Sequence, residues 1–290
     1  MSDRAHTELL EHARAIVAGE PGAASGDGPS PPRWLGADWE RQRGIGQYID
    51  HTLLKPEATP AQVLGLCDEA ERLGVKAVCV NGSWVESCAE RLAGTAVLVA
   101  AVAGFPLGAM DTRAKVAEAR LAVTAGASEV DVVMALGRAK AGEWNSVGDD
   151  IRAVVEASGQ AAVKVILETA ALEPVEIAAA CLVSRAAGAA FVKTSTGFHP
   201  AGGATREAVA LMRAAVGPGI GVKASGGIRT VEAALGMLAA GANRIGTSSA
   251  QAMSSHLGPR APRLGEALRS LVEVPGRARQ SGGIGLGGSA

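Results

Sequence analysis

Three lysines lie inside apolar segments of the sequence, where a charged side chain is unusual. They are Lys164 in AVKVILET, Lys193 in FVKTSTGF and Lys223 in GVKASGG. Lysine is rarely buried without a partner, and burial disfavours its ammonium form. A neutral lysine amine attacks a carbonyl carbon to form an imine, whose protonated form stabilises a carbanion at the adjacent carbon. The three lysines therefore predict metal-independent aldol chemistry through a Schiff base, although their spacing does not say which lysine attacks and which tunes it.

Carboxylates in similar apolar segments are the candidate proton carriers. Asp131 lies in EVDVVMAL and Asp50 in YIDHTLLKP, and either could pair with a lysine and relay protons. A structural salt bridge or a helix cap explains each of them equally well. Glu168 is a weaker candidate of the same type. His51 follows Asp50 directly, so it is expected to face the opposite side of its strand and to pack or hydrogen-bond rather than bind a metal.

Glycine and hydroxyl residues in the last third of the chain predict a phosphate site. Backbone N–H groups at glycine turns and at helix N-termini bind phosphate well, and ordinary turn and cap chemistry is the alternative explanation. The GTSSA segment is expected to open a helix after the last strand. The candidate residues are Thr196, Gly197, Gly226, Gly227, Ser248 and Ser249.

A repeating pattern along the chain explains how these residues could meet. A short segment rich in Val, Ile and Ala alternates eight times with a longer segment of helical periodicity. The predicted strands are 47–52, 75–80, 97–104, 129–135, 163–169, 191–196, 221–225 and 243–247. The predicted helices between them include 59–73, 112–125, 174–187, 205–215 and 230–239. Unbroken alternation of this kind predicts an α/β protein, a (β/α)8 TIM barrel, with its active site at the C-terminal ends of the strands.

The predicted domain organisation is a barrel with a short N-terminal extension. Residues 1–43 are expected to form a helix, over 7–17, and a linker rich in Gly and Pro. Residues 44–275 form the catalytic TIM barrel, and residues 276–290 form a disordered tail. A barrel of roughly 250 residues and a short extension fit within the 290 residues, whereas two full-size domains would be cramped.

Composition excludes several classes of partner. The net charge is -1 with the charges interspersed, so no nucleic-acid partner is expected. The longest apolar run, 96–105, is shorter than the roughly 20 residues of a membrane span, and the acidic N-terminal segment is unlike a transit peptide. These features predict a cytoplasmic protein. No cofactor is expected, and neither the five His nor the four Cys show the spacing of a metal site, so the cysteines are expected to be reduced structural thiols.

At these residues the sequence resembles the deoxyribose-phosphate aldolases, a family of class I aldolases. The resemblance runs from Ile49 to Ser249 through DHTLLKPEAT, VCVN, GFPLG, EVDVVM, VKVILET, FVKTSTGF, VKASGGIRT and NRIGTSS, of which FVKTSTGF and VKASGGIRT form a highly specific pair. It implies reversible cleavage of 2-deoxy-D-ribose 5-phosphate to D-glyceraldehyde 3-phosphate and acetaldehyde. It also implies a small phosphorylated sugar and an aldehyde as the only partners, and we expect a homodimer.

The resemblance assigns roles to individual residues. Lys193 matches the Schiff-base lysine, Lys223 the neighbour that favours its neutral form, and Asp131 the proton-relay acid. Asp50, Lys164 and Thr196 match residues of the substrate pocket. Gly197, Gly226, Gly227, Ser248 and Ser249 match phosphate-binding elements. Cys79 matches a pocket cysteine for which no catalytic duty is expected.

Two alternatives remain at the level of sequence. The chain could be a different Schiff-base aldolase or a transaldolase-like barrel, which substrate profile would distinguish. It could also be a barrel that binds a phosphosugar without turnover, which would be expected to lack a catalytic lysine or the relay acid. Lys193, Lys223 and Asp131 are all present.

Overall fold

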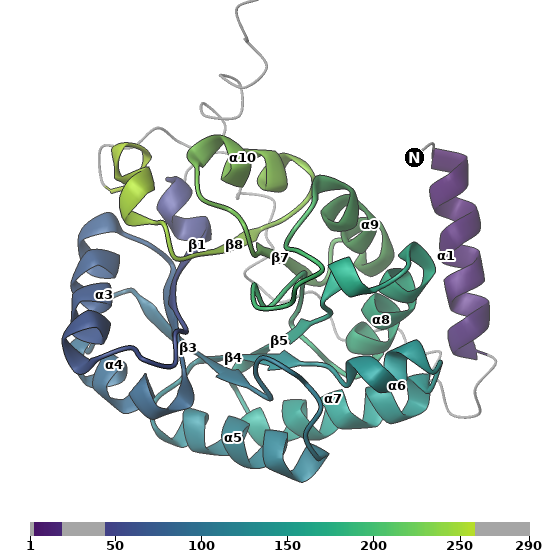
Figure 1. Cartoon of the computed structure of the whole chain (residues 1–290), viewed down its shortest axis with the longest axis horizontal. Coiled ribbons are helices and arrows are strands. Elements are labelled where there is room, and N and C mark those ends of the chain that lie inside the picture. Colours follow the sequence, from purple (N-terminus) through teal and green to yellow (C-terminus); the bar gives the residue numbers. More distant parts are fainter. Residues whose placement is uncertain (1–2, 19–43, 259–290) are drawn as a thin grey trace, which may run out of the picture.

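Eight parallel strands form a closed barrel in which each strand pairs with the next in sequence and β8 returns to β1 (Figure 1). The computed structural model describes residues 3–18 and 44–258. The strands are β1 (Ile49–Leu53), β2 (Ala77–Val80), β3 (Leu98–Ala103), β4 (Glu129–Val133), β5 (Ala162–Ile166), β6 (Phe191–Lys193), β7 (Gly221–Ser225) and β8 (Arg244–Thr247). The predicted TIM barrel is confirmed, and every predicted strand overlaps an observed one.

Helices surround the barrel between successive strands. They are α3 (Pro60–Leu73), α4 (Val85–Arg91), α5 (Thr112–Thr124), α6 (Leu136–Lys140), α7 (Trp144–Ser158), α8 (Pro174–Ala186), α9 (Arg206–Val216) and α10 (Val231–Ala239). Helices α3, α9 and α10 begin after Thr59, Thr205 and Thr230, whose hydroxyls accept backbone N–H bonds of the first turn. The helix expected after β8 is instead the six-residue 3-10 helix η5 (Gln251–His256).

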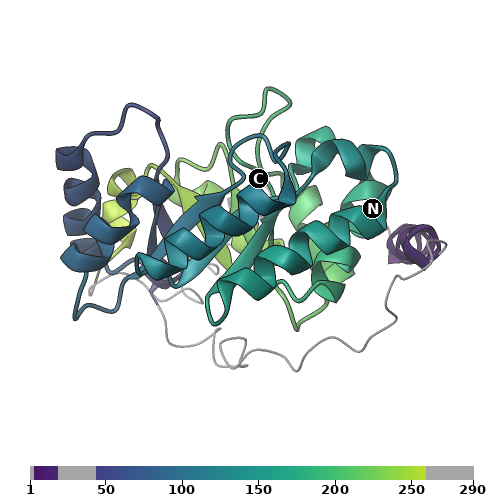
Figure 2. The ribbon, with the colours of Figure 1, turned by 90° about the horizontal axis from the view of Figure 1, so that it is seen from below.

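An additional helix, α1 (Asp3–Ala18), lies outside this ring against α8 and α9 (Figures 1 and 2). Ala13 is fully buried in the contact. The helix predicted over 7–17 falls within α1. The linker predicted for the rest of the N-terminal segment and the tail predicted for 276–290 lie outside the described residues, as does the boundary at 275.

No helix in the described ranges combines the length and the apolarity needed to cross a bilayer.

The interior of the barrel is divided into an apolar part and a charged part. Alternate strand residues face outward, where Val78, Val130 and Val165 pack against the helices. Facing inward, Leu54, Cys79, Ala100 and Val102 form a small apolar cluster with Phe105. The inward positions of β1 and of β4 to β8 carry charged side chains instead. The barrel therefore brings together charges that lie far apart in the sequence.

Gly221 gives a test of the packing beneath this charged part. It lies opposite Phe191 in the β6–β7 pair, and a Cβ atom at this position would overlap the aromatic ring. Gly221→Ala is expected to lower the free energy of unfolding by about 1–3 kcal/mol, because the core must shift to admit the methyl group. Urea unfolding measures the change. Gly219→Ala is the matched control, since no atom lies within 4 Å of its added Cβ, and equal destabilisation by both would contradict the packing.

Candidate active site

Asp131 on β4 is the centre of the charged part of the barrel. Its Oδ1 accepts a hydrogen bond from Nζ of Lys164 at 2.7 Å. Its Oδ2 accepts bonds from Nζ of Lys193 at 2.8 Å and of Lys223 at 2.7 Å. All four side chains are buried, and they come from four successive strands. The structure thus brings together the four residues that the sequence singled out most strongly.

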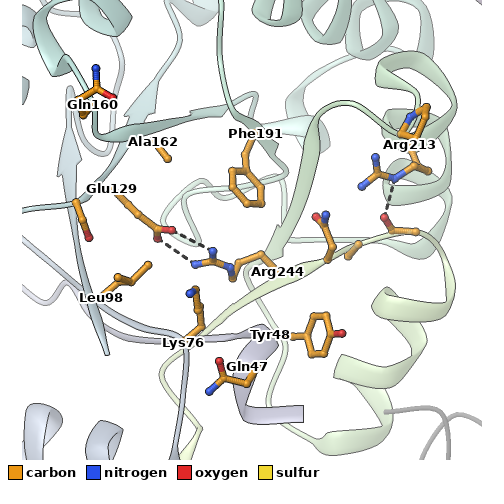
Figure 3. Close-up of a pocket in the computed structure, with 15 residues that line it drawn as sticks. Gln47, Tyr48, Lys76, Leu98, Glu129, Gln160, Ala162, Phe191, Arg213 and Arg244 are labelled. Atoms are coloured by element: carbon orange, nitrogen blue, oxygen red, sulfur yellow. Dashed lines mark hydrogen bonds and ion pairs between the residues drawn. The ribbon is translucent and has the colours of Figure 1, made fainter. Parts of the chain in front are cut away.

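A second layer of charges lies on the N-terminal side of Asp131. Asp50 on β1 accepts hydrogen bonds from Lys223 and from Arg244, the latter at 2.7 Å. Glu129 lies 2.7 Å from Nζ of Lys164 and accepts two bonds of 3.0 Å from Arg244 (Figure 3). Asp50 thus pairs with the lysines as expected.

Sequence reasoning missed Glu129 and Arg244. Glu129 was detectable, because it stands two residues before Asp131 and so faces the same side of the strand. Arg244 is the first residue of its strand and had no such neighbour to point to it.

The carboxylates of this cluster are held in the ionised form. Burial raises the pKa of Asp131, but Lys164, Lys193 and Lys223 lower it more, and the net pKa lies well below the usual range. The pKa values of Asp50 and Glu129 are also lowered, because nearby lysines and Arg244 outweigh their burial. These acids are therefore ionised near neutral pH and contribute negative charge to the cluster.

Burial alone does not set the charge of the lysines. It lowers the pKa of Lys223, but Asp131 and Asp50 raise it, and the net shift is upward. The pKa of Lys164 is raised for the same reason, by Asp131 and Glu129. The expectation that burial would make these two amines neutral is therefore wrong, because it took no account of the carboxylates that each one meets.

Lys193 differs from the other bases of the cluster in two ways. Among the described residues it has one carboxylate partner within salt-bridge distance, Asp131, whereas Lys164, Lys223 and Arg244 each have two or more. It is also the one charged member of the cluster, within the described ranges, that lines a cavity at the C-terminal mouth of the barrel. Of the three lysines in the cluster, Lys193 is therefore the one that a carbonyl compound in the mouth could reach.

The mouth cavity has a volume of about 270 Å³ and is built from the loops after β1, β6, β7 and β8. Its predicted phosphate-binding residues are Thr196, Gly197, Gly226, Gly227 and Ser248. The three glycines adopt left-handed backbone conformations, with φ of 84°, 89° and 79°, which other residues rarely adopt. Ser249 does not line the cavity, and its N–H donates to Oγ1 of Thr247 at 2.9 Å.

Two exposed cations, Lys55 and Arg229, also line the mouth cavity and were missed as candidates. Their positions in KPEAT and GGIRT look like ordinary loop residues. Only the folded barrel brings these two loops to the same opening.

Glu168 does not join the lysine cluster. It has a left-handed backbone, with φ of 58°, and its carboxylate accepts a hydrogen bond of 2.5 Å from Oγ1 of Thr196 and another of 3.2 Å from its N–H. The side chain turns to the loop after β6, so it does not face the lysines as the expected proton carriers do. It fixes Thr196 at the edge of the mouth.

The remaining polar candidates are His51 and the cysteines. His51 faces the helices, as expected, and its Nε2 lies 2.8 Å from Oε2 of Glu69 on α3. The four cysteines are free and buried. Cys79 lies within 4.0 Å of Asp131, and burial raises the pKa of its thiol. No three His, Cys, Asp or Glu side chains in the described ranges are arranged to hold a metal ion.

Known proteins resemble the chain over the whole barrel. Residues 45–256 match the family described as DeoC/LacD family aldolase. The deoxyribose-phosphate aldolase of Brevibacillus brevis is 53% identical over 205 residues, which cover 71% of this chain and 92% of the relative. That of a Geobacillus species is 53% identical over 209 residues, 72% of this chain and 93% of the relative. The tetrameric structure of deoxyribose phosphate aldolase from Aeropyrum pernix superposes with a TM-score of 0.68 at 30% identity, over 93% of this chain and 100% of that one.

The lowered carboxyl pKa values predict how stability depends on pH. A group whose pKa is lower in the folded than in the unfolded state contributes stability that is fully present above the unfolded value, about 4.3 for Glu, and is lost as the pH falls toward the folded value. Glu129→Gln removes one such group. The slope of unfolding free energy against pH is therefore expected to fall by up to about 1.4 kcal/mol per pH unit below about pH 4.3.

Urea unfolding at a series of acidic pH values measures this slope. Glu143→Gln is the control, because it removes the same charge from a salt bridge whose two side chains are about half exposed. It is expected to change the slope less. A Glu129→Gln slope equal to that of the wild type would contradict the assignment.

Proposed function

This chain belongs to the DeoC/LacD family of aldolases, and we propose that it is a deoxyribose-phosphate aldolase that forms its Schiff base on Lys193. It cleaves 2-deoxy-D-ribose 5-phosphate reversibly to D-glyceraldehyde 3-phosphate and acetaldehyde. The observation that carries the assignment is the position of Lys193. Its Nζ is bound to Asp131 on one side, and its side chain lines the mouth cavity on the other.

The first steps form the imine. The neutral Nζ of Lys193 attacks the aldehyde carbon, C1, of the open-chain sugar, and the resulting carbinolamine loses water. Asp131 is within hydrogen-bond reach of both Lys193 and Lys223, so it can accept a proton from one nitrogen while the other supplies one to the leaving oxygen. The product is a protonated imine whose positive charge is next to C2.

The next steps break the carbon–carbon bond. A base removes the proton of the C3 hydroxyl, the C2–C3 electron pair moves toward the imine, and glyceraldehyde 3-phosphate leaves. The remaining enamine takes a proton at C2, and hydrolysis of the imine releases acetaldehyde and restores the amine. The Asp131–Lys223 pair is the proton carrier nearest to Lys193, which supports its role in these transfers. Asp50 and Lys164 hold this pair in place.

The phosphate of the substrate is expected at the outer part of the mouth. Gly197, Gly226 and Gly227 offer backbone N–H groups, and Ser248 offers a hydroxyl. Lys55 and Arg229 add two positive charges at the same opening. Ser249 could contribute only if the loop after β8 shifted, because it lies outside the cavity lining.

Two further expectations complete the proposal. We expect the protein to act in the cytoplasm, as its composition predicts. We also expect a homodimer, and the relative from Aeropyrum pernix, described as a tetramer, shows that a barrel of this kind can assemble further. Sedimentation or light scattering of the purified chain measures the assembly.

Borohydride trapping tests the nucleophile. Incubation with acetaldehyde or with deoxyribose 5-phosphate, followed by reduction, is expected to leave one stable adduct on Lys193, because the imine becomes a secondary amine. Peptide mass mapping locates the adduct. Lys193→Met is expected to give neither adduct nor turnover. An adduct on Lys164 or Lys223 with none on Lys193 would reassign the reaction, and a folded wild-type protein without any adduct would refute it.

Glu168→Gln tests the loop that carries Thr196. Loss of the charged acceptor weakens the hydrogen bonds to Thr196, so the phosphate end of the pocket loses its alignment while the lysine cluster is untouched. We expect KM for deoxyribose 5-phosphate to rise roughly 10-fold with kcat changed less than about 3-fold. Steady-state kinetics measures both. Glu173→Gln, at the exposed start of α8, is the control. An equal fall in kcat would place Glu168 in the chemical steps instead.

A further inference from the structure

Arg244 and Glu129 form a salt bridge (Figure 3) that lines a cavity at the N-terminal ends of the strands, whereas Lys193 lines the mouth cavity at their C-terminal ends. We propose that this pair sets the charge state of Lys193, so that Arg244 and Glu129 are positioning residues for the amine that attacks the substrate. The inference rests on the proposed function of Lys193.

Two short chains of ion pairs connect the salt bridge to Lys193. On one side Arg244 binds Asp50 at 2.7 Å, Asp50 binds Lys223, and Lys223 binds Asp131 at 2.7 Å. On the other side Glu129 lies 2.7 Å from Lys164, which binds Asp131 at 2.7 Å. Both chains end at the carboxylate that holds Lys193. A change of charge at Arg244 or Glu129 is therefore felt at Asp131 through groups with little water between them.

The pair cannot touch substrate in the mouth cavity. Arg244 and Glu129 line a different cavity, of about 590 Å³, at the N-terminal ends of the strands (Figure 3). Phe191 lines the same cavity, with its ring centroid 5.3 Å from the guanidinium of Arg244 and 6.0 Å from Nζ of Lys164. Any effect of the pair on the reaction must therefore act through the other charges.

The charges of the cluster explain what the pair does. Four bases and three acids face one another inside the barrel, namely Lys164, Lys193, Lys223, Arg244, Asp50, Glu129 and Asp131. Cys79, from β2, is the other titratable group near Asp131, and burial raises its thiol pKa, so it adds no charge near neutral pH. The cluster is neutral only if one base is unprotonated. Lys193 has the fewest carboxylate partners, so its ammonium form is the one that the cluster stabilises least.

Removing Arg244 and removing Glu129 are expected to shift the pH at which the neutral amine of Lys193 appears in opposite directions. Arg244→Met leaves three bases and three acids, so the ammonium of Lys193 is balanced and the neutral amine appears only at higher pH. Glu129→Gln leaves four bases and two acids, so the neutral amine appears at lower pH. The acidic limb of kcat/KM against pH reports this ionisation in the free enzyme. It is expected to shift up by about 1 pH unit in the first variant and down by about 1 in the second.

The double variant Arg244→Met with Glu129→Gln gives the sharpest outcome. It has three bases and two acids, the same excess of one base as the wild type, so its acidic limb is expected to return close to the wild-type position. Arg244→Lys keeps the positive charge, so its acidic limb of kcat/KM against pH is expected to stay at the wild-type position. The surface pair of Arg138 and Glu143 provides charge-matched controls, Arg138→Gln and Glu143→Gln, which are expected to leave the profile unchanged.

The experiment separates this inference from the proposed function. Cleavage of deoxyribose 5-phosphate is followed across the pH range for each folded variant, and borohydride trapping on the wild type is done first. Failure of the wild type to form the Lys193 adduct refutes the proposed function. A trapped wild type whose two single variants shift in the same direction, or do not shift, overturns the role of the salt bridge. If Arg244→Met does not fold, Glu129→Gln alone decides. An acidic limb of its kcat/KM profile that stays at the wild-type pH, or moves to higher pH, contradicts the inference.

Discussion

The structure depends on one carboxylate that holds three lysines inside a closed barrel. Removing an ion from water costs several kcal/mol, and a buried ion pair recovers that only when its partners satisfy each other fully. Asp131 meets Lys164, Lys193 and Lys223, and the further pairs to Asp50, Glu129 and Arg244 complete their hydrogen bonding. Since a well-packed apolar core would be at least as stable, we infer that the charges are kept for the reaction.

The barrel makes this arrangement possible because its strands point alternate residues to a common interior. One part of that interior, from β2 and β3, is apolar, with Cys79, Ala100 and Val102 filling it. The remaining six strands each contribute a charged group, and β4 contributes two, Glu129 and Asp131, whose repulsion is offset by the bases that pair with them. The low polarity of the apolar part of the interior strengthens every ion pair in the charged part. The electrostatic environment of Lys193 is thus set by residues on six strands, none of which could form the site alone.

The sequence predicted the barrel and the centre of the site, because alternating segments and charged residues within apolar ones are local signals. Glu129 could have been found by counting two residues back from Asp131, but Arg244 needed the closure of β8 on β1 to meet Asp50. Glu168 was misread because its backbone conformation turns the carboxylate away from the barrel axis, which no pattern of residue types indicates. The 3-10 helix after β8 and the position of Ser249 outside the mouth likewise depend on packing.

Burial of a lysine is not in itself a sign of catalysis, as Lys115 shows. This lysine on α5 is fully buried, but its Nζ lies 2.6 Å from Asp150 on α7, and the two charges balance each other between helices. Lys193 shares its carboxylate with two other lysines, in a cluster with more bases than acids, and it faces a cavity. In the proposed function, this imbalance and this access together single out Lys193 as the amine that reacts. A search for nucleophilic lysines should therefore count the charges of the whole buried cluster rather than the burial of each residue.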